Sequence, residues 1–492
     1  MDKGKSKTVI VIVGMPGAGK SLASSVAAKR GVPVFVSGDI IRAEAKRRSL
    51  PPSRKNLGRL MLKIREEEGM GAVAKRLAPI IDRIDEKILE DIEQIQSGLV
   101  IFTDIGSGYL DIISKILRNR DIVIADHHQP LGDPVGVHHF NTHIMGFNGS
   151  EEISGAGTTY LLAKALDSRN VDLSPMAIVG ALGDQQDKAA KRGFKGLNSE
   201  ILKDAVDSRL IEVKQDLIFF GRQTRPVHRA IASTTDPFLP GLSGEEDRCL
   251  ALLDAARVLT KIDDRWRTIS DLSLDEKQRI VEKIVAHIIS LNLKGEIIMD
   301  LIGSVYSLLR EDPGTSLRDG REFATLLNAC GRMNRAALGI AIGVGDRGDS
   351  YKAAQEVYAQ YKTTLSKYMN WIAASPNAMR RGRHVVIVNG NGVIDENMTG
   401  AVSSLVSSSN LFGDKVTIVT TVTASGEAKV STRATERLVG KGVNLGKTLQ
   451  TLAAQHGGVG GGHAIAAGAT IPKIELERFL KEVESSVEGL LD

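Results

Sequence analysis

Residues 99–128 read LVIFTDIGSGYLDIISKILRNRDIVIADHH, and this stretch decides the fold class. Its first and last parts, LVIFTD at 99–104 and DIVIADHH at 121–128, are apolar runs typical of buried strands. A helix-forming segment at 108–118 connects them. A strand–helix–strand unit of this kind places both strands parallel in one sheet, so the sequence predicts an α/β fold.

Acidic and imidazole groups stand where these two strands end. Asp104 ends the first strand, and Asp126, His127 and His128 end the second. Because the carboxyl ends of neighbouring parallel strands meet at one edge of a sheet, we expect these groups to lie close together. Asp184 closes another apolar run, AIVGALGD, and we expect it at the same edge. Carboxylates and imidazoles form a ligand set that suits Mn²⁺ or Mg²⁺, and two such ions can activate water and hold the oxygens of a phosphoryl displacement.

Each of these residues alone also fits a structural role. An aspartate at the end of a strand often caps the following helix, and adjacent histidines often pair with neighbouring groups in a core or at a surface. Five of the ten histidines lie between residues 127 and 143. Three of these five are interpreted as structural, namely His138, His139 and His143.

The N-terminal stretch GMPGAGKS at 14–21 matches the phosphate-binding loop GxxxxGK(S/T) and follows a predicted strand at 8–14. A helix-forming run comes after it, as this loop requires. In such a loop the backbone N–H groups approach phosphate oxygens, the lysine reaches the β- and γ-phosphates, and the hydroxyl binds Mg²⁺. The alternative is a glycine-rich turn without a ligand. The candidate residues for binding a nucleotide such as ATP are Gly14, Gly17, Gly19, Lys20 and Ser21.

A second glycine-rich block, GGVGGGHAIAAG at 457–468, has too many glycines for a simple turn. Its backbone amides, including those of Gly461 and Gly462, are candidates for binding a phosphate, with His463 placed to contact the reacting group. A flexible loop is the alternative. Arg332 and Arg433 are candidate phosphate ligands because a guanidinium group matches phosphate geometry, although either alone is more often a surface arginine.

The composition is that of an ordinary globular protein of 492 residues with a net charge of +5. Hydrophobic residues make up 42% and charged residues 25%, which excludes disorder or a coiled coil as the main structure. Two cysteines, Cys249 and Cys330, cannot form a disulfide framework or a zinc site, and they indicate a reducing compartment. No apolar run approaches the ~18 residues of a membrane span, so we expect no membrane association and a cytoplasmic location.

Several motifs, in combination and in this order, resemble those of DHH-family phosphoesterases, specifically the archaeal RecJ-like nucleases that associate with the GINS replication complex. The resemblance extends from about residue 82 to the end of the chain. It rests on IFTDIGSG, IADHH, ISGAGTTY, IVGALGDQQD, LIFFGRQTRP, EFATLLNACGRMN, STRATERLVGKGVNLG and GGGHAIAAG. The segment before about residue 78 resembles part of the archaeal adenylate-kinase-like and dephospho-CoA-kinase-like proteins, including their Gly38-Asp39 and Ile41-Arg42 stretch.

The resemblance to the RecJ-like nucleases implies hydrolysis of phosphodiester bonds in single-stranded DNA or RNA, one nucleotide at a time. It also implies GINS and the replicative helicase complex as partners. The metal-site residues that it implies are Asp104, Asp126, His127 and Asp184, with His128 as a further ligand or a supporting group. The residues that it implies for holding a nucleic-acid phosphate between two lobes are Asn328, Arg332, Arg433 and His463.

One motif of the family is missing. The family begins with a strand that ends in His-x-Asp-x-Asp-Gly, which supplies further metal ligands, and no such motif precedes Asp104. The strand at 8–14 is a candidate for the missing sheet position, but its loop carries Lys20, which would repel a metal ion. One ion could still bind, with the rate lowered by on the order of 10²–10³ or more. The alternatives to a weakened nuclease are a replication scaffold without activity and a nucleotide-binding protein.

These observations predict four parts of the chain. Residues 1–80 form a partial kinase-like segment with the phosphate-binding loop, and 81–240 form the DHH-type parallel-sheet domain. Residues 241–375 form a helical insertion with connecting helices, and 380–492 form a small C-terminal α/β domain that binds substrate. The stretch 379–383 is interpreted as a linker, and 432–439 as a helix.

Overall fold

The computed structural model describes residues 10–13, 89, 92–93, 98–132, 135–234, 237, 239–291, 300–409, 412–423 and 425–491. The predicted nucleotide-binding residues Gly14, Gly17, Gly19, Lys20 and Ser21 lie outside these residues. The chain divides into two compact units, residues 1–357 and 358–492, which are described separately. No helix in the described part is both long and apolar enough to cross a membrane.

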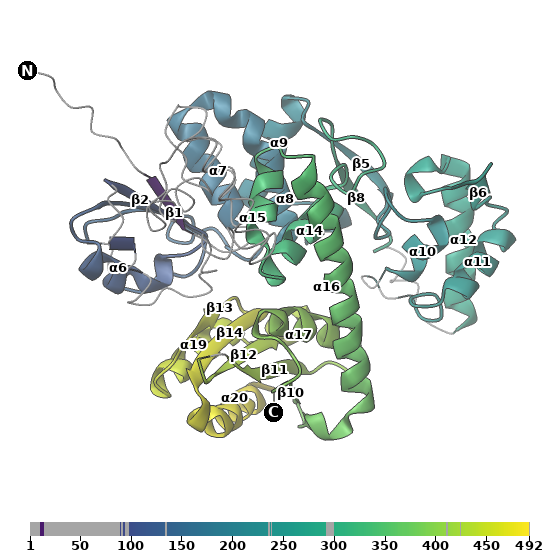
Figure 1. The fold of residues 1–492 in the computed structure, drawn as a ribbon. Coiled ribbons are helices and arrows are strands. Elements are labelled where there is room, and N and C mark those ends of the chain that lie inside the picture. The colour runs from purple at the N-terminus through teal and green to yellow at the C-terminus, as the bar shows by residue number, and fades with distance from the viewer. Residues whose placement is uncertain are drawn as a thin grey trace, which may run out of the picture. The chain divides into compact units, whose positions relative to one another are not determined.

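The first unit contains a four-stranded parallel sheet in the order β1-β2-β3-β4 (Figure 1). Its strands are β1 Ile10–Val13, β2 Leu99–Thr103, β3 Asp121–Asp126 and β4 His138–Asn141. The helix α6 Leu110–Ile116 connects β2 to β3 and confirms the predicted strand–helix–strand unit. The N-terminal strand β1 pairs with β2, so it does occupy the sheet position beside the predicted site.

Alternation of apolar side chains explains why these strands form a sheet. Val100 and Phe102 of β2 and Ile122 and Ile124 of β3 are buried in one core cluster. Ile113 of α6 belongs to the same cluster. Burial of a large aliphatic side chain contributes about 1.5–3 kcal/mol, so this core holds the ends of β2 and β3 in register.

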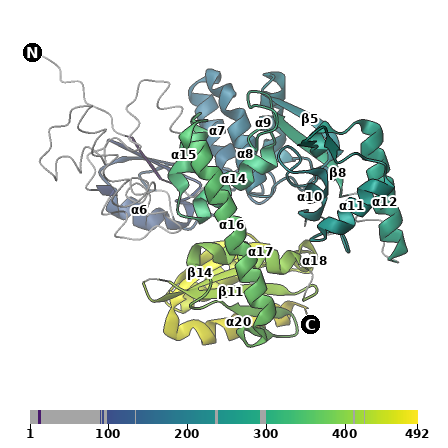
Figure 2. The same cartoon turned by 45° about the vertical axis from the view of Figure 1, so that its right-hand side comes forward.

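Three helices follow the sheet in sequence: α7 Gly155–Leu166, α8 Ser174–Gly183 and α9 Gly196–Asp207. They pack in sequence order, α7 on α8 and α8 on α9 (Figure 2). The run AIVGALGD, which was expected to end at the edge of the sheet, therefore forms the helix α8 instead of a strand. The run AIVGALG is apolar all round because α8 is covered on several sides, and a short run of this kind does not distinguish a buried strand from a buried helix.

The rest of the first unit begins with the antiparallel pair β5 Ile211–Leu217 and β8 Ile302–Leu308. The segment between these strands is mainly helical and has its own hydrophobic core, which includes Leu253, Ile280 and Ile284. Its elements are α10 Val227–Ala232, α11 Glu246–Ala255, the hairpin β6 Lys261–Ile262 and β7 Arg265–Trp266, and α12 Leu274–Ser290. After β8 come α14 Gly320–Arg332 and α15 Ala336–Gly343. The helix α16 Asp349–Ala374 begins in the first unit and continues into the second. The helical character predicted for this region is confirmed, but strand β8 was not expected.

A partly buried ion pair joins Arg267, the residue after the hairpin, to α12. Arg267 donates from Nη1 and Nη2 to the two carboxylate oxygens of Glu276, at 2.6 and 2.7 Å. Glu276 also completes a capping box with Ser273 at the start of α12. The hydrogen bonds from Arg267 lower the pKa of Glu276 to about 2.

The substitution Glu276→Gln is expected to lower the free energy of unfolding by about 1–3 kcal/mol at pH 7. Glutamine still completes a capping box, so the loss reports on the charge paired with Arg267. Because the pKa of Glu276 is lower in the folded than in the unfolded state, this stabilisation is present above pH 4.5 and is lost as the pH falls toward about 2. Thermal unfolding between pH 7 and pH 3 measures the difference. An equal loss in the control Glu282→Gln, at an exposed position of α12, would contradict this assignment.

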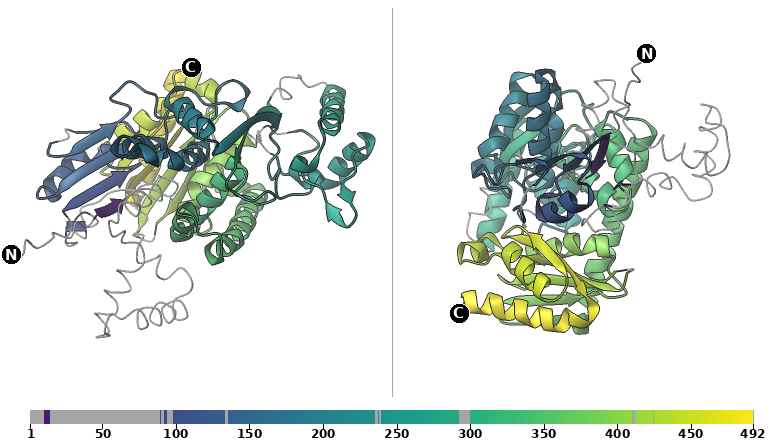
Figure 3. Two further views of the ribbon diagram at one scale, coloured as in Figure 1. Left: turned by 90° about the horizontal axis from the view of Figure 1, so that it is seen from above. Right: turned by 90° about the vertical axis from the view of Figure 1, so that its left-hand side faces the viewer.

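The second unit is a six-stranded sheet in the order β13-β14-β12-β11-β10-β9. Only the pair β10 and β11 is parallel. Helices α19 and α20 share a core with one face of the sheet, along which α20 lies (Figure 3), and α17 packs on β11 and β12. The strands are β9 Met379–Arg381, β10 Val385–Asn389, β11 Val416–Val422, β12 Glu427–Arg433, β13 Val459–Gly462 and β14 Ala466–Pro472. The helices are α17 Thr399–Ser408, α18 Glu436–Gly440, α19 Leu445–Gln455 and α20 Leu476–Leu491.

Two local expectations for this unit are wrong. The predicted linker at 379–383 contains the edge strand β9, which pairs with β10. The helix predicted from residue 432 starts only at Glu436, because β12 continues to Arg433. The glycine block forms the hairpin β13–β14. A Cβ at Gly460 would lie 2.5 Å from the Leu449 carbonyl oxygen, so this glycine lets the strand pack closely on α19.

Candidate metal centre

The predicted acids and histidines come together at the carboxyl end of the parallel sheet. Asp104 directly follows β2, and Asp126, the last residue of β3, is followed by His127 and His128. Thr103 pairs with Ala125 in the register of these strands, which brings the two ends side by side. One ligand atom from each of the four residues lies within 4.8 Å of those of the others. The expectation that these four side chains lie close together is confirmed, and their role as metal ligands stays a prediction.

Asp104 has a left-handed backbone conformation, with φ of 61°. Residues other than glycine rarely adopt it, and the strain costs of order 1–3 kcal/mol, although Asp and Asn tolerate it better than most. Its N–H donates to the Ala125 carbonyl at 2.9 Å, so Asp104 remains tied to β3. Gly155, the first residue of α7, is packed closely against it: a Cβ there would lie 2.2 Å from Asp104 Oδ1. The missing side chain at Gly155 therefore leaves the space that the Asp104 carboxylate fills.

His127 is buried, and its ring orientation is determined by two backbone carbonyls. Its Nδ1 lies 2.7 Å from the Gly149 oxygen and 2.9 Å from the Ile153 oxygen. A carbonyl only accepts hydrogen bonds, so Nδ1 carries the proton. The other ring nitrogen, Nε2, lies 2.9 Å from Asp104 Oδ1. In the neutral ring, a nitrogen lone pair and a carboxylate oxygen thus face each other.

This arrangement fits a bound cation. Among the described residues Asp104 Oδ1 is a buried oxygen without a donor in hydrogen-bond geometry, although it lies close to His127. A proton or a metal ion between the two groups would relieve their repulsion. Burial disfavours the charged imidazole, yet the Asp104 carboxylate raises the pKa of His127 to about 10. A neutral Nε2 beside a carboxylate oxygen is a suitable donor pair for Mn²⁺ or Mg²⁺.

Asp126 is fully buried and organises both histidines. Its Oδ2 accepts from the Ser107 N–H at 3.0 Å. Its Oδ1 accepts from the His127 N–H at 2.8 Å and from His128 Nδ1 at 2.8 Å. Although burial opposes ionisation, the neighbouring His128 holds the pKa of Asp126 well below its usual range. Asp126 is therefore a carboxylate in the folded protein. Because it accepts from Nδ1 of His128, the neutral ring carries its proton on Nδ1 and its lone pair on Nε2.

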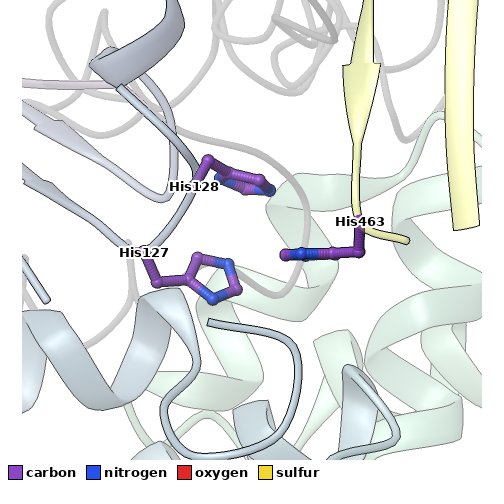
Figure 4. Close-up of side chains that lie close together, drawn as sticks. All are labelled: His127, His128 and His463. Carbon is purple, nitrogen blue, oxygen red and sulfur yellow. The ribbon is translucent and has the colours of Figure 1, made fainter. Parts of the chain in front are cut away.

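The two histidine rings lie next to each other at the end of β3 (Figure 4). Their centroids are 4.4 Å apart and the rings are inclined by 63°. The His128 side chain is 30% exposed, whereas that of His127 is 2% exposed. His127 thus lies in the base of the cluster and His128 at its surface. The nearby His139, interpreted from the sequence as structural, contacts Ser107 Oγ at 2.8 Å through its Nε2.

Asp184 follows α8 and is its C-terminal capping residue. It does not end a strand, and it is not among the four residues whose ligand atoms lie within 4.8 Å of one another. Burial and the charge of Asp104 raise the pKa of Asp184, and the charge of Asp184 helps to raise the pKa of His127. Asn328 of α14 donates from Nδ2 to the Gly183 carbonyl at 3.2 Å, beside Asp184. Arg332 lies one turn further along the same helix. The structure thus places these two predicted phosphate-binding residues on a helix that packs against α8.

The remaining predicted site residues belong to the second unit. Arg433 ends β12, and its Nε donates to Ser404 Oγ of α17 at 2.8 Å. Gly461 and Gly462 lie in β13, and His463 follows them (Figure 4). Gly462 pairs with Ala467 of β14, and Arg433 pairs with Ala466 of the same strand, so Arg433 and His463 share one end of this sheet.

Sequence reasoning missed the groups that support the histidines. Gly149 and Ile153 supply the carbonyls for His127, and the buried Gln186 also contacts both of these carbonyls. The repeated polar residues in GDQQD were a usable signal, because a buried glutamine needs hydrogen-bond partners. Nothing in a sequence pattern indicates which carbonyl a histidine contacts, because that contact spans 22 to 26 residues.

Comparison with known proteins adds three family matches. A DHH-CID domain matches residues 219–302, a DHHA1 domain matches 384–489, and an AAA domain matches 13–98. An uncharacterized protein of Methanocaldococcus jannaschii is 27% identical over 416 residues, which is 83% of this chain and 85% of that protein. A UPF0200 protein of Hyperthermus butylicus is 39% identical over 132 residues, which is 27% of this chain and 70% of that protein.

A solved structure extends the comparison to the whole chain. The crystal structure of CDC45 from Entamoeba histolytica aligns with 98% of this chain and 96% of its own. The TM-score is 0.53 and the sequence identity is 11%, so the two proteins share a fold.

Proposed function

We propose that this chain, which contains DHH-CID and DHHA1 domains and an N-terminal segment of the UPF0200 family, is a RecJ-like metal-dependent phosphodiesterase. In this proposal it removes nucleotides from an end of single-stranded DNA or RNA in the cytoplasm, during replication or repair. The observation that carries the proposal is the Nε2 of His127 facing Asp104 Oδ1 at 2.9 Å, with Nδ1 already bonded to carbonyls. A divalent cation fits this pair of acceptors.

In this site Asp104, Asp126, His127 and Asp184 would hold the ion. When bound, Mn²⁺ or Mg²⁺ lowers the pKa of water and neutralises charge on a phosphate oxygen. The other residues do not depend on the ion for their roles. Asp126 keeps His128 with Nδ1 protonated, so Nε2 is the ring nitrogen that can exchange a proton with substrate.

We assign phosphate binding to two sets of residues, each considered within its own unit. In the first unit we assign this role to Asn328, whose position beside Asp184 is set by its bond to Gly183, and to Arg332. In the second unit we assign it to Arg433, Gly461, Gly462 and His463. Guanidinium and backbone N–H groups match phosphate oxygens, so binding should weaken as salt is raised.

The site has fewer acids than the two-metal arrangement of the family. The described residues of β1 are Ile10–Val13, and none of them carries a carboxylate. The proposal is therefore a site for one ion, with a rate below that of a complete site by on the order of 10²–10³. The predicted ATP site lies outside the described residues and has no part in this proposal.

End-labelled single-stranded DNA and RNA incubated with Mn²⁺ provide the test. The full-length protein is expected to give a ladder of shortened products that disappears with a chelator and with the variant His127→Gln. Glutamine retains a hydrogen-bonding group of similar reach but lacks the imidazole donor. A folded protein that gives no products with Mn²⁺ or Mg²⁺ would contradict the proposal.

The described residues of β1 are aliphatic and supply no metal ligand. This observation also favours a second function, that of a scaffold in the replication machinery. The fold shared with CDC45 agrees with it but shows the fold alone. In this case the protein binds GINS or the replicative helicase complex and does not hydrolyse nucleic acid. Pull-down with purified GINS, in parallel with the nuclease assay, separates the two functions.

A further inference from the structure

We propose that Gln186 is a positioning residue for the metal centre, acting through two backbone carbonyls on His127. The inference rests on the metal site proposed above. Gln186 is 1% exposed and is the third residue after the end of α8. Within the part of the chain that the structure describes, Gln186 makes no hydrogen bond with the acids of the cluster, so any effect on the metal ion has to pass through the residues between them.

The Gly149 and Ile153 carbonyls each accept from both His127 and Gln186. Gln186 Nε2 lies 2.8 Å from the Gly149 oxygen and 3.1 Å from the Ile153 oxygen. His127 Nδ1 approaches the same two oxygens at 2.7 and 2.9 Å. A carbonyl oxygen has two lone pairs, so one donor from each side chain satisfies it. The four hydrogen bonds hold the connection before α7 between His127 on one side and Gln186 on the other.

The orientation of the Gln186 amide is itself determined. Asn198, in the first turn of α9, donates from Nδ2 to Gln186 Oε1 at 2.7 Å. This contact directs Nε2 toward the carbonyls, which could not accept from an oxygen. The Asn198 N–H also donates to the Glu152 carbonyl at 2.8 Å, in the same connecting segment. Asn198 is 0% exposed, so water does not replace these bonds.

Gln186 affects the metal ion through the orientation of the His127 ring. The two carbonyls keep the proton on Nδ1 and thereby leave Nε2 toward Asp104 Oδ1. Without Gln186, each carbonyl keeps only one of its two donors, and the bond from the Asn198 N–H to the Glu152 carbonyl is left to hold the segment 149–153 to α9. His127 then samples other ring orientations. Loss of a hydrogen-bond partner behind a metal ligand typically costs 10- to 100-fold in metal affinity.

The test uses the full chain and the variant Gln186→Met, which preserves volume but has no amide. Calorimetry with Mn²⁺ is expected to show a dissociation constant raised about 10- to 100-fold. Metal-free protein labelled with ¹⁵N-histidine gives a second readout, the slowly exchanging proton on His127 Nδ1, assigned with His127→Gln. We expect this proton to be protected in the wild type and to exchange rapidly in the variant.

A matched control separates positioning from a general loss of stability. Asn170 is a buried amide whose Nδ2 donates to the Ala163 carbonyl at 2.8 Å, away from His127. Asn170→Ala is expected to leave both readouts unchanged. If Gln186→Met does not fold, Asn198→Ala serves as the second variant and is expected to move both readouts in the same direction.

One result would overturn the inference about Gln186, and a different result would overturn the proposed metal site. A protected Nδ1 proton in Gln186→Met, with Mn²⁺ affinity within twofold of the wild type, would show that Gln186 does not position His127. Absence of Mn²⁺ binding by the wild type would contradict the proposed metal site instead. In that case the proton readout in metal-free protein still decides whether Gln186 holds the ring.

Discussion

Replacement of Asp104 by asparagine is expected to lower Mn²⁺ affinity at least 10-fold and the rate of nucleic-acid hydrolysis by about 10²–10³-fold. The change removes the charge that faces His127 Nε2 and leaves a side chain of the same shape. It also avoids a backbone artefact, because asparagine tolerates the left-handed conformation found at this position, with φ of 61°. Calorimetry with Mn²⁺ and the end-labelled ladder assay measure the two effects. Wild-type affinity and rate in this variant would exclude Asp104 from the site.

The same substitution should change how stability depends on pH in the metal-free protein. Asp104 raises the pKa of His127 to about 10 in the folded state, above the ordinary value of 6.5. The pair therefore stabilises the folded protein fully below pH 6.5, and this contribution is lost as the pH rises toward 10. Asp104→Asn is expected to destabilise the protein at pH 6 more than at pH 10. A difference that does not vary with pH would argue against a charged His127 in the metal-free state.

The second large effect is expected from Gly155→Ala. In a helix alanine is ordinarily more favourable than glycine by about 1 kcal/mol, so this change would normally stabilise the protein. Here the added Cβ would lie 2.2 Å from Asp104 Oδ1, and the carboxylate or the start of α7 has to move. We expect a loss of about 1–3 kcal/mol in the free energy of unfolding and a loss of Mn²⁺ affinity of about 10-fold or more.

Gly489→Ala is the matched control for this prediction. Gly489 lies in the helix α20, is exposed, and would have nothing within 4 Å of an added Cβ. Its replacement is expected to stabilise the protein by about 0.5–1 kcal/mol and to leave Mn²⁺ affinity unchanged. Stabilisation by Gly155→Ala similar to that of Gly489→Ala, with normal metal affinity, would show that Asp104 does not depend on this close approach.

The sequence by itself determined the features that depend on local pattern and order. Two apolar runs joined by a helix predict parallel neighbours, and residues that follow such strands share one edge of the sheet. For that reason the sequence predicts that Asp104 lies close to the Asp126-His127-His128 run. The motifs also indicate the DHH family, and the phosphate-binding loop indicates a kinase-like N-terminal segment.

Only the tertiary structure decided the features that depend on distant contacts. A short apolar run looks the same in a buried strand and a buried helix, so Asp184 was expected at a strand end and lies at the end of α8. The glycines at 155 and 460 were not interpretable as sites of close approach, because the neighbour that requires them is far away in sequence. The ring orientation of His127 likewise depends on carbonyls 22 and 26 residues away and on Gln186, 37 and 33 residues beyond those carbonyls. A histidine in a sequence is a candidate ligand, and the packing around it decides which nitrogen it presents.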